Sequence, residues 1–234
     1  ITKNASNPTT AQGLSINSDA SATSNDETGF VNSGIVKVEN GVLTGTDSTA
    51  AMSVNYGKIE NKNKVEMTNA GVGIFGTNGS KLVNDTKGSI TIEEKGIGIA
   101  ANASSINPGT TALVTFGTDK AGATGNAVDI LNAGKIEIKG KDSIGISVKN
   151  NSDKDKSKLL VKNTGTIVLG DNGAGISVKS ENPNATNQGA TIELAGNITV
   201  GKDGIGTYAQ NSDVKLTNDL NVNVKDSGVG IYLK

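Results

Sequence analysis

Three short apolar segments follow one another in residues 128–148, which read VDILNAGKIEIKGKDSIGISV. Within each segment apolar and polar residues alternate, which is the period of a β-strand whose side chains point to opposite faces. Gly, Asn, Asp or Ser bounds the segments, and these residue types favour turns. Because no helical period is visible in the sequence, the pattern predicts a chain built from short strands.

The same segments recur along the chain as a short apolar run, an N-x-G-x-I-x-V motif and a G-x-G-I motif. Copies or close variants of G-x-G-I lie at 71–74, 96–99, 143–146, 173–176, 204–207 and 228–231. Three strands per repeat of this length describe one coil of a parallel β-helix, in which each strand pairs with its equivalent one coil later. The sequence therefore predicts an all-β, right-handed, single-stranded parallel β-helix. We expect one segment over 1–234, with three strands per coil, about seven to eight coils and an insertion at 101–125.

Stacking the repeats predicts which side chains fill the interior. The expected inward columns are Ile74, Ile99, Ile146, Ile176 and Ile231; Ile90, Ile136, Ile167, Ile198 and Val222; and Ile92, Ile138, Leu169, Val200 and Val224. β-Branched side chains suit such a narrow stacked core. A further column is expected two residues before the motif Gly, where stacked amides can hydrogen-bond from coil to coil. It comprises Asn32, Asn132, Asn163 and Asn218, and is interrupted at Thr86 and Leu194.

Composition excludes several classes of function. The chain has 234 residues, no Cys and no His, and all 22 of its basic residues are Lys. A disulfide framework and a thiolate site are therefore excluded, and the commonest general base and metal ligand is missing. Without Arg, and with a formal net charge of -1, the chain lacks the electrostatic attraction that nucleic-acid binding needs. No run of 18 apolar residues is present, so we expect no membrane insertion by this segment.

One corner of the coil varies in length, immediately after the G-x-G-I strand. It holds residues 76–80, 101–125, 149–157, 179–189 and 209–213 in consecutive coils. Insertions that cluster on one side of a repeat protein often mark its binding face. Long polar loops can also change in length without a functional reason, because a longer loop costs little free energy. The longest insertion contains the apolar stretch Ala112–Phe116. We take Leu113, Phe116, Asp119 and Lys120 as candidate binding residues.

Outward aromatic residues form a second candidate site. Phe75, Tyr208 and Tyr232 stand two residues after the second Gly of their motif, on the solvent side of the strand. Since Tyr208 and Tyr232 belong to adjacent coils, we expect them to be able to stack. Such a pair can serve as a platform for a sugar or a protein surface, or it can simply stabilise the sheet.

Acidic residues at the turn before G-x-G-I are a third candidate. Asp142, Asp171, Asp203 and Asp226, with Glu94, would form a column of carboxylates if they stack, and such a column can collect Ca²⁺. Asp is also a common turn residue, and Lys141, Lys202 and Lys225 adjoin three of these acids. We therefore assign no metal site, no cofactor and no catalytic residue from the sequence.

The alternation of the two motifs, the Lys- and Asn-rich turns and the missing Cys resemble passenger domains of type V autotransporters. The resemblance is to the very large fusobacterial outer-membrane adhesins of the RadD type, and it covers roughly 29–234. It implies a location on the bacterial cell surface and adhesion to a protein or glycan receptor on host cells or other bacteria. It also implies a longer parent chain that carries a C-terminal outer-membrane β-barrel, in line with the lack of a polar capping unit after Gly230.

Two other functions remain open at this stage. Polysaccharide-acting enzymes of the pectate-lyase type share the β-helix fold, but they need a cleft of acids with Arg, Lys or His, and the acids here are spread along turns. We therefore expect no enzyme activity. A purely structural spacer within an adhesin stalk is the other alternative, because the repeat motifs contain no ligand-binding residues.

Overall fold

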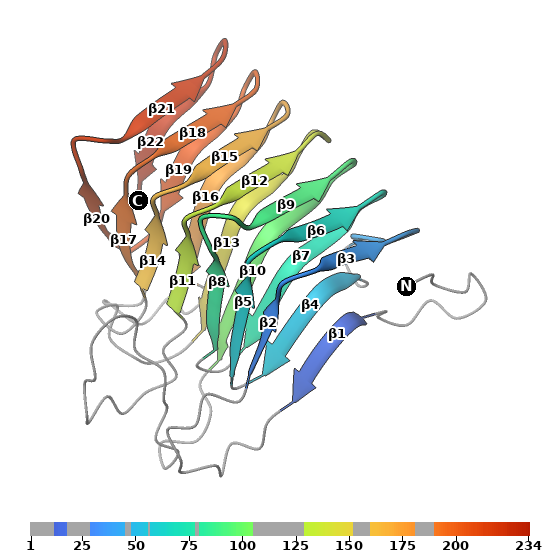
Figure 1. Ribbon diagram of the computed structural model, residues 1–234. Helices are drawn as coiled ribbons and strands as arrows, with labels where there is room; N and C mark the ends of the chain where they lie inside the picture. Colours follow the sequence, from blue (N-terminus) through green and yellow to red (C-terminus); the bar gives the residue numbers. More distant parts are fainter. Residues whose placement is uncertain are drawn as a thin grey trace, which may run out of the picture.

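The computed structural model describes residues 12–17, 29–44, 48–55, 57–77, 80–104, 129–151, 160–180 and 190–234. All the regular elements in these ranges are β-strands, and none of these residues forms a helix that could span a membrane. The strands wind into a right-handed parallel β-helix with three strands per coil, as the sequence predicts (Figure 1).

Three parallel sheets run along the rod. Sheet 1 contains β1 (Gln12–Asn17), β4 (Ala50–Asn55), β7 (Gly71–Thr77), β10 (Gly96–Ser104), β13 (Ile144–Asn151), β16 (Ala174–Ser180), β19 (Ile205–Ala209) and β22 (Val229–Leu233). Sheet 2 contains β2 (Gly29–Asn32), β5 (Lys58–Asn61), β8 (Lys81–Asn84), β11 (Asp129–Asn132), β14 (Leu160–Asn163), β17 (Thr191–Leu194) and β20 (Asp213–Leu216). Sheet 3 contains β3 (Ile35–Val38), β6 (Lys64–Met67), β9 (Ser89–Ile92), β12 (Lys135–Ile138), β15 (Thr166–Leu169), β18 (Asn197–Val200) and β21 (Asn221–Val224).

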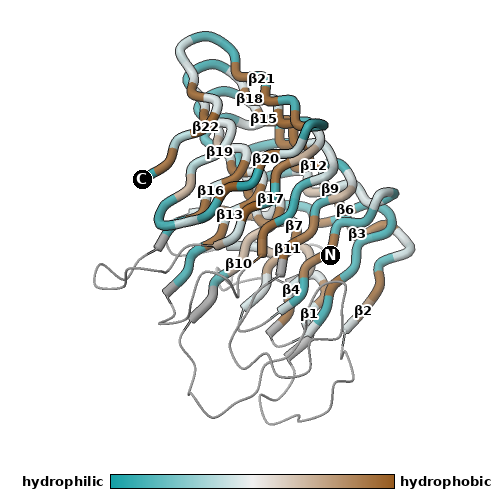
Figure 2. The backbone as a smooth tube through the Cα atoms, turned by 90° about the vertical axis from the view of Figure 1, so that its left-hand side faces the viewer, coloured by the Kyte–Doolittle hydropathy of each residue, from teal (hydrophilic) through white to brown (hydrophobic). Residues whose placement is uncertain are grey.

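The interior is filled by the three predicted columns, which Figure 2 shows as apolar segments that recur from coil to coil. Ile74, Ile99, Ile146 and Ile176 pair in register in sheet 1, and none of the four is exposed. The other two columns lie in sheet 3 with the predicted pairing. Sheet 2 adds a fourth column, consisting of Ile59, Leu82, Ile130, Val161 and Ile192. Burying each such side chain contributes about 1.5–3 kcal/mol to the free energy of unfolding.

A coil that the sequence motifs did not reveal precedes Gly71. Met52 pairs with Ile74, Val65 with Ile90 and Met67 with Ile92, so this coil extends all three columns toward the N-terminus. Its residues 61–67 read NKNKVEM, with Asn in the place of the motif Gly, Val in the place of Ile and Met in the place of the final Val. The flexible Met side chain fills the position of a branched one, which explains why the coil packs without matching the motif.

Both positions of the G-x-G-I glycines lie close to sheet 3, although Ser143 occupies the first of them in one coil. A Cβ atom on Gly98 would lie 2.5 Å from Cγ2 of Ile136, and one on Gly96 would lie 2.7 Å from Cδ1 of Ile92. The same contacts recur in other coils, where the second Gly meets the first Ile of the N-x-G-x-I-x-V motif. The two motifs are therefore steric partners, and each explains why the other recurs.

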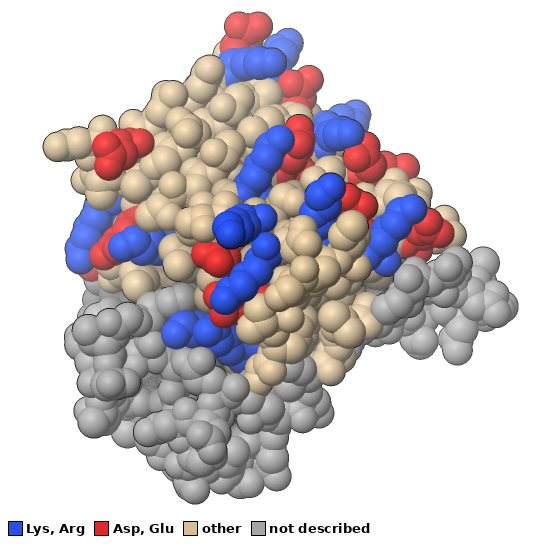
Figure 3. Space-filling view, in the orientation of Figure 1, with Lys and Arg blue, Asp and Glu red and all other residues tan. Residues whose placement is uncertain are grey.

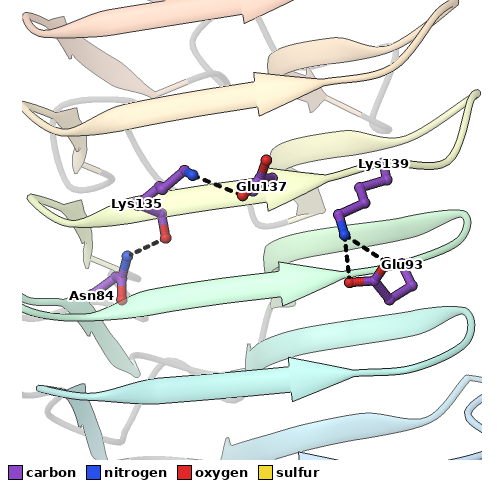
Figure 4. Close-up of polar contacts among 5 residues, drawn as sticks. All are labelled: Asn84, Glu93, Lys135, Glu137 and Lys139. Carbon is purple, nitrogen blue, oxygen red and sulfur yellow. Dashed lines mark hydrogen bonds and ion pairs between the residues drawn. The ribbon is translucent and has the colours of Figure 1, made fainter.

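A ladder of buried Asn side chains runs along the corner between sheets 2 and 3. The ladder consists of Asn32, Asn61, Asn84, Asn132 and Asn163, and each of the first four donates from Nδ2 to Oδ1 of the next over 2.7–2.8 Å. Asn163 instead donates to the carbonyl of Ala195, because Leu194 takes the next rung. Asn84 also donates to the main-chain carbonyl of Lys135, which lies in the neighbouring coil (Figure 4).

The predicted ladder was wrong at two places, the interruption at Thr86 and the member Asn218. Asn84, not Thr86, stands in register with Asn132, because the turn before β9 is two residues longer than the turn before β12. Asn218 lies outside the ladder, since Leu216 is the residue that pairs with Leu194. In both cases the turn length between the Asn and the strand varies, so counting back from the Gly position misplaced the rung.

We expect Ile167→Asp to unfold the surrounding coils. The substitution would bury a carboxylate in a column where Ile167 has no exposed surface, at a cost of several kcal/mol. Thermal unfolding followed by circular dichroism checks this, with the outward neighbour Thr166→Asp as the control. An Ile167→Asp variant that melts with the wild type would contradict the burial of this column. Ile146→Asp should behave in the same way.

Asn132→Ala should lower the free energy of unfolding by about 2–4 kcal/mol. It leaves the Asn84 amide without its acceptor and the Asn163 carbonyl without its donor, and each buried loss costs about 1–3 kcal/mol. Asn218→Ala is the matched control and should change stability by less than about 0.5 kcal/mol. Chemical denaturation of both variants measures the difference, and equal losses would refute the ladder as described.

Thr207→Val should stabilise the protein by about 1 kcal/mol. Thr207 takes the place of an Ile between Ile176 and Ile231, is completely buried, and its hydroxyl oxygen has no hydrogen-bond partner. Valine has nearly the same shape without the unpaired polar group. The melting temperature should rise for Thr207→Val and stay unchanged for Thr199→Val, which alters the outer side of sheet 3; a lower melting temperature for Thr207→Val would be the opposite result.

Candidate binding face

The outer face of sheet 1 consists of outward side chains that stack in register from coil to coil. Its first column is Ala50, Val72, Ile97, Ile144, Ala174, Ile205 and Val229, and its second is Ser53, Phe75, Ala100, Ser147, Ser177, Tyr208 and Tyr232. A third column contains Thr77, Asn102, Lys149 and Lys179. The face is thus mainly small, apolar and aromatic, with two lysines.

A short hairpin covers the N-terminal half of this face. Leu43 and Ser48 form an antiparallel bridge, and Val42 and Thr49 hydrogen-bond to each other through main-chain and side-chain atoms at 2.9 and 3.1 Å. Leu43 packs against a cluster of Ala50, Val72, Ala100, Phe75 and Ile97. The face therefore has two parts. Its N-terminal half is covered by the chain itself, whereas Tyr232 in the last coil is 46% exposed.

The structure separates the three predicted aromatic residues into two groups. Phe75, Tyr208 and Tyr232 do share one outward column, but Ala100, Ser147 and Ser177 stand between Phe75 and the tyrosines, and Phe75 belongs to the cluster under Leu43. Tyr208 and Tyr232 stack as predicted, with ring centroids 5.6 Å apart and planes inclined by 8°. The ammonium of Lys179 lies 5.9 Å from the centre of the Tyr208 ring, within cation–π range.

Charge is distributed unequally among the three sheets. The eight described strands of sheet 1 contain no Asp or Glu, and their only basic residues are Lys149 and Lys179. The strands of sheets 2 and 3 carry Glu60, Glu66, Asp129, Glu137, Glu193 and Asp213. Figure 3 shows basic and acidic side chains next to one another on the side of the rod where sheets 2 and 3 face the viewer.

Many of the charges on sheets 2 and 3 are paired. Lys135 and Glu137 approach to 2.7 Å, and Lys139 reaches Glu93 in the next coil at 2.8 Å (Figure 4). The hydrogen bond and the negative charge of Glu93 raise the pKa of Lys139 above its usual value. Lys162 meets Glu193 at 3.2 Å in the same manner. These pairs are exposed and add little to stability, but they keep both faces hydrated.

The turn acids do not form the column that was considered for Ca²⁺. The register of sheet 1 aligns Asp142 with Asn172 and Asp203, whereas Asp171 aligns with Lys141 and Lys202. Acids and lysines therefore alternate along the rod, and no three carboxylates among the described residues come close enough to hold a metal ion. The Asp171 carboxylate instead accepts the main-chain N–H of Lys202 at 2.8 Å, which is the role of a turn residue.

The predicted candidates Leu113, Phe116, Asp119 and Lys120 lie outside the described residues. The strands that lead into the long insertions are described, however. Ser104 of β10 pairs with Asn151 of β13, and Asn150 pairs with Ser180 of β16. The first residues of the predicted insertions at 101–125, 149–157 and 179–189 therefore belong to strands of sheet 1, and Lys149 and Lys179 are among them.

Sequence reasoning found the aromatic pair but missed the charge distribution. The signal was available, because every G-x-G-I strand lacks Asp and Glu in a chain that has 23 acids. What the face can do follows from its groups: two lysines and two tyrosines can hold an anion and pack against a ring. Comparison with protein-family models, curated protein sequences and solved structures gives no match for this chain.

Proposed function

We propose that this chain is a rod-shaped binding segment of a bacterial surface adhesin, and that it makes its contact through the outer face of sheet 1. The motifs that resemble autotransporter passenger domains support the location and the class of protein. The observation that carries the assignment of the face is the absence of Asp and Glu from the described strands of sheet 1, next to a stacked pair of outward tyrosines.

Desolvation favours sheet 1 over the other two sheets as a contact surface. Binding removes water from both partners, and a buried charge pair regains little of what its hydration supplied. Sheets 2 and 3 carry ion pairs such as Lys139–Glu93 and Lys162–Glu193 over much of their outer surface. The outer face of sheet 1 instead carries the stacked Tyr208 and Tyr232 beside small and apolar residues, and interface cores are enriched in Tyr and depleted in acidic residues.

The rod suits attachment at a distance from the cell. Each coil rests on its neighbours through three ladders of main-chain hydrogen bonds and continuous apolar columns, so the face is held rigidly. Groups held on a rigid scaffold bind without the entropy cost of ordering a flexible surface.

Adhesion of the purified chain to host cells and to other bacteria tests this function. We expect the wild type to adhere and the double variant Lys179→Glu/Tyr232→Ala to lose most of its adhesion. The matched control is Lys87→Glu/Val31→Ala, which makes the same charge change at an exposed turn and removes a 50% exposed, outward side chain from sheet 2. All proteins must first give the same β-type circular dichroism.

Three results of this assay are informative. Loss in the sheet 1 variant with retention in the control supports the proposal. Equal adhesion of both variants moves the contact away from this face, and a further variant in which a short turn replaces residues 105–124 then tests the longest insertion. No adhesion by the wild type would make the chain a spacer within the stalk.

A further inference from the structure

We infer that a patch in the C-terminal half of the sheet 1 face binds a leucine, or a similar branched apolar side chain, that a polar turn of a partner protein presents. The chain itself supplies the pattern for this contact, because Leu43 already makes it in the N-terminal half of the face. The inference rests on the proposed function, since it names the kind of partner and the contact residues of the same face.

The contact of Leu43 shows what this face accepts. Leu43 lies on three aliphatic residues of the first outward column, and the second column adds two small residues and one aromatic ring. Four of these six outward side chains are buried, and the other two are half-buried. We call this group the Leu43 patch; it consists of Ala50, Val72, Ile97, Ser53, Phe75 and Ala100.

The next three coils repeat this composition in what we call the second patch. Its first column again holds three aliphatic residues, and its second column again holds two small residues and one aromatic ring. Its members are Ile144, Ala174, Ile205, Ser147, Ser177 and Tyr208. Five of the six are only half-buried, and Ser177 alone is buried. The Tyr208 ring is fixed by its stack on Tyr232. Neither patch contains a charged residue.

The turns between sheets 3 and 1 explain why a hairpin covers only the first patch. The connection that carries Leu43 comprises residues 39–49 and is long enough to fold back over the face. The equivalent connections into β13, β16 and β19 are much shorter and contain no large apolar residue; they comprise residues 139–143, 170–173 and 201–204. These connections therefore supply no counterpart of Leu43 to the second patch.

The chemistry of the partner follows from the hairpin. Residues 41–50 read GVLTGTDSTA, so the leucine stands among Gly, Ser and Thr. Val42 and Thr49 hydrogen-bond to each other, which leaves the hairpin in contact with the face through side chains. A partner turn of the same kind suits the second patch, because β13, β16 and β19 are hydrogen-bonded on both sides and offer no free edge to an added strand.

A sugar is the alternative ligand, and the aliphatic residues disfavour it. Tyr208 could pack against a sugar ring, but Ile144 and Ile205 on either side of Ala174 would then face hydroxyl groups. A hydroxyl group that leaves water without gaining a hydrogen bond loses free energy. A leucine side chain has no polar group to desolvate, so it matches the whole patch.

Methyl NMR of the chain labelled at Ile and Val tests the inference. The probe is a peptide with the sequence of residues 41–50, closed by a terminal disulfide, and its control carries Leu43→Ser. We expect the leucine peptide to shift the signals of Ile144 and Ile205 in a saturable manner and to leave the buried Ile167 unchanged. The serine peptide should bind about ten-fold or more weakly, because it lacks the apolar surface that is buried. Lactose at the same concentrations should cause no shift.

Two variants of the protein locate the contact. Ala174→Glu places a carboxylate in the second patch and should abolish the shift of Ile205. Thr199→Glu, on the outer side of sheet 3, is the matched control and should bind as the wild type does. Leu43→Ser uncovers the Leu43 patch and should add a second binding event, seen as a shift of Val72. Circular dichroism verifies the fold of each variant, and the pair of glutamate variants carries the test if Leu43→Ser does not fold.

The possible failures are distinguishable. Equal binding of the two peptides, or full binding by Ala174→Glu, would overturn the inference, and shifts caused by lactose alone would assign the patch to a sugar. Adhesion to cells that Ala174→Glu retains, without peptide binding, would overturn the patch and leave the proposed function standing. Peptide binding by a protein that adheres to no cell would support the patch and refute the proposed function.

Discussion

The spacing of about 4.8 Å between hydrogen-bonded strands governs this molecule. Every coil must repeat the main-chain path of the coil before it, because its N–H and C=O groups bond to that coil and to the next. Side chains at equivalent positions are therefore forced into contact with one another. Ile136 must pack on Ile90 and Ile167, and Asn132 must meet Asn84 and Asn163. A residue therefore suits a position only if its side chain packs or hydrogen-bonds well against the equivalent side chains of the two neighbouring coils.

Glycine in the G-x-G-I motif shows the same constraint acting between sheets. The coil is so narrow that the chain turning into sheet 1 contacts the side chains of sheet 3 directly, and a Cβ on Gly98 would collide with Ile136. Small residues on one wall pack closely against branched residues on the other. Both stacked tyrosines lie outside.

The sequence was sufficient to predict the fold, the three columns and the outward position of the tyrosines, because all of these depend on periodicity alone. The remaining errors in the predicted register came from turns whose lengths differ between coils. Asn84 and Asn218 were misassigned because the turns after β8 and β20 are longer than those after β11 and β14. Asp171 was grouped with Asp142 for the same reason, although the two differ by one position in register. The coil with Met52 and Met67 was missed because methionine satisfies the packing without matching the motif.

The candidate face was only half predictable, since it depends on which strands become neighbours around the rod. Periodicity identifies outward positions but does not say that Leu43 closes one half of the face, or that Lys179 lies beside Tyr208. One consequence of the Asn ladder concerns how such a protein changes its length over evolution. Each amide contacts only the rung before and the rung after it, so inserting a complete coil recreates every bond that it interrupts. Gene duplication can therefore lengthen the rod without any compensating substitution.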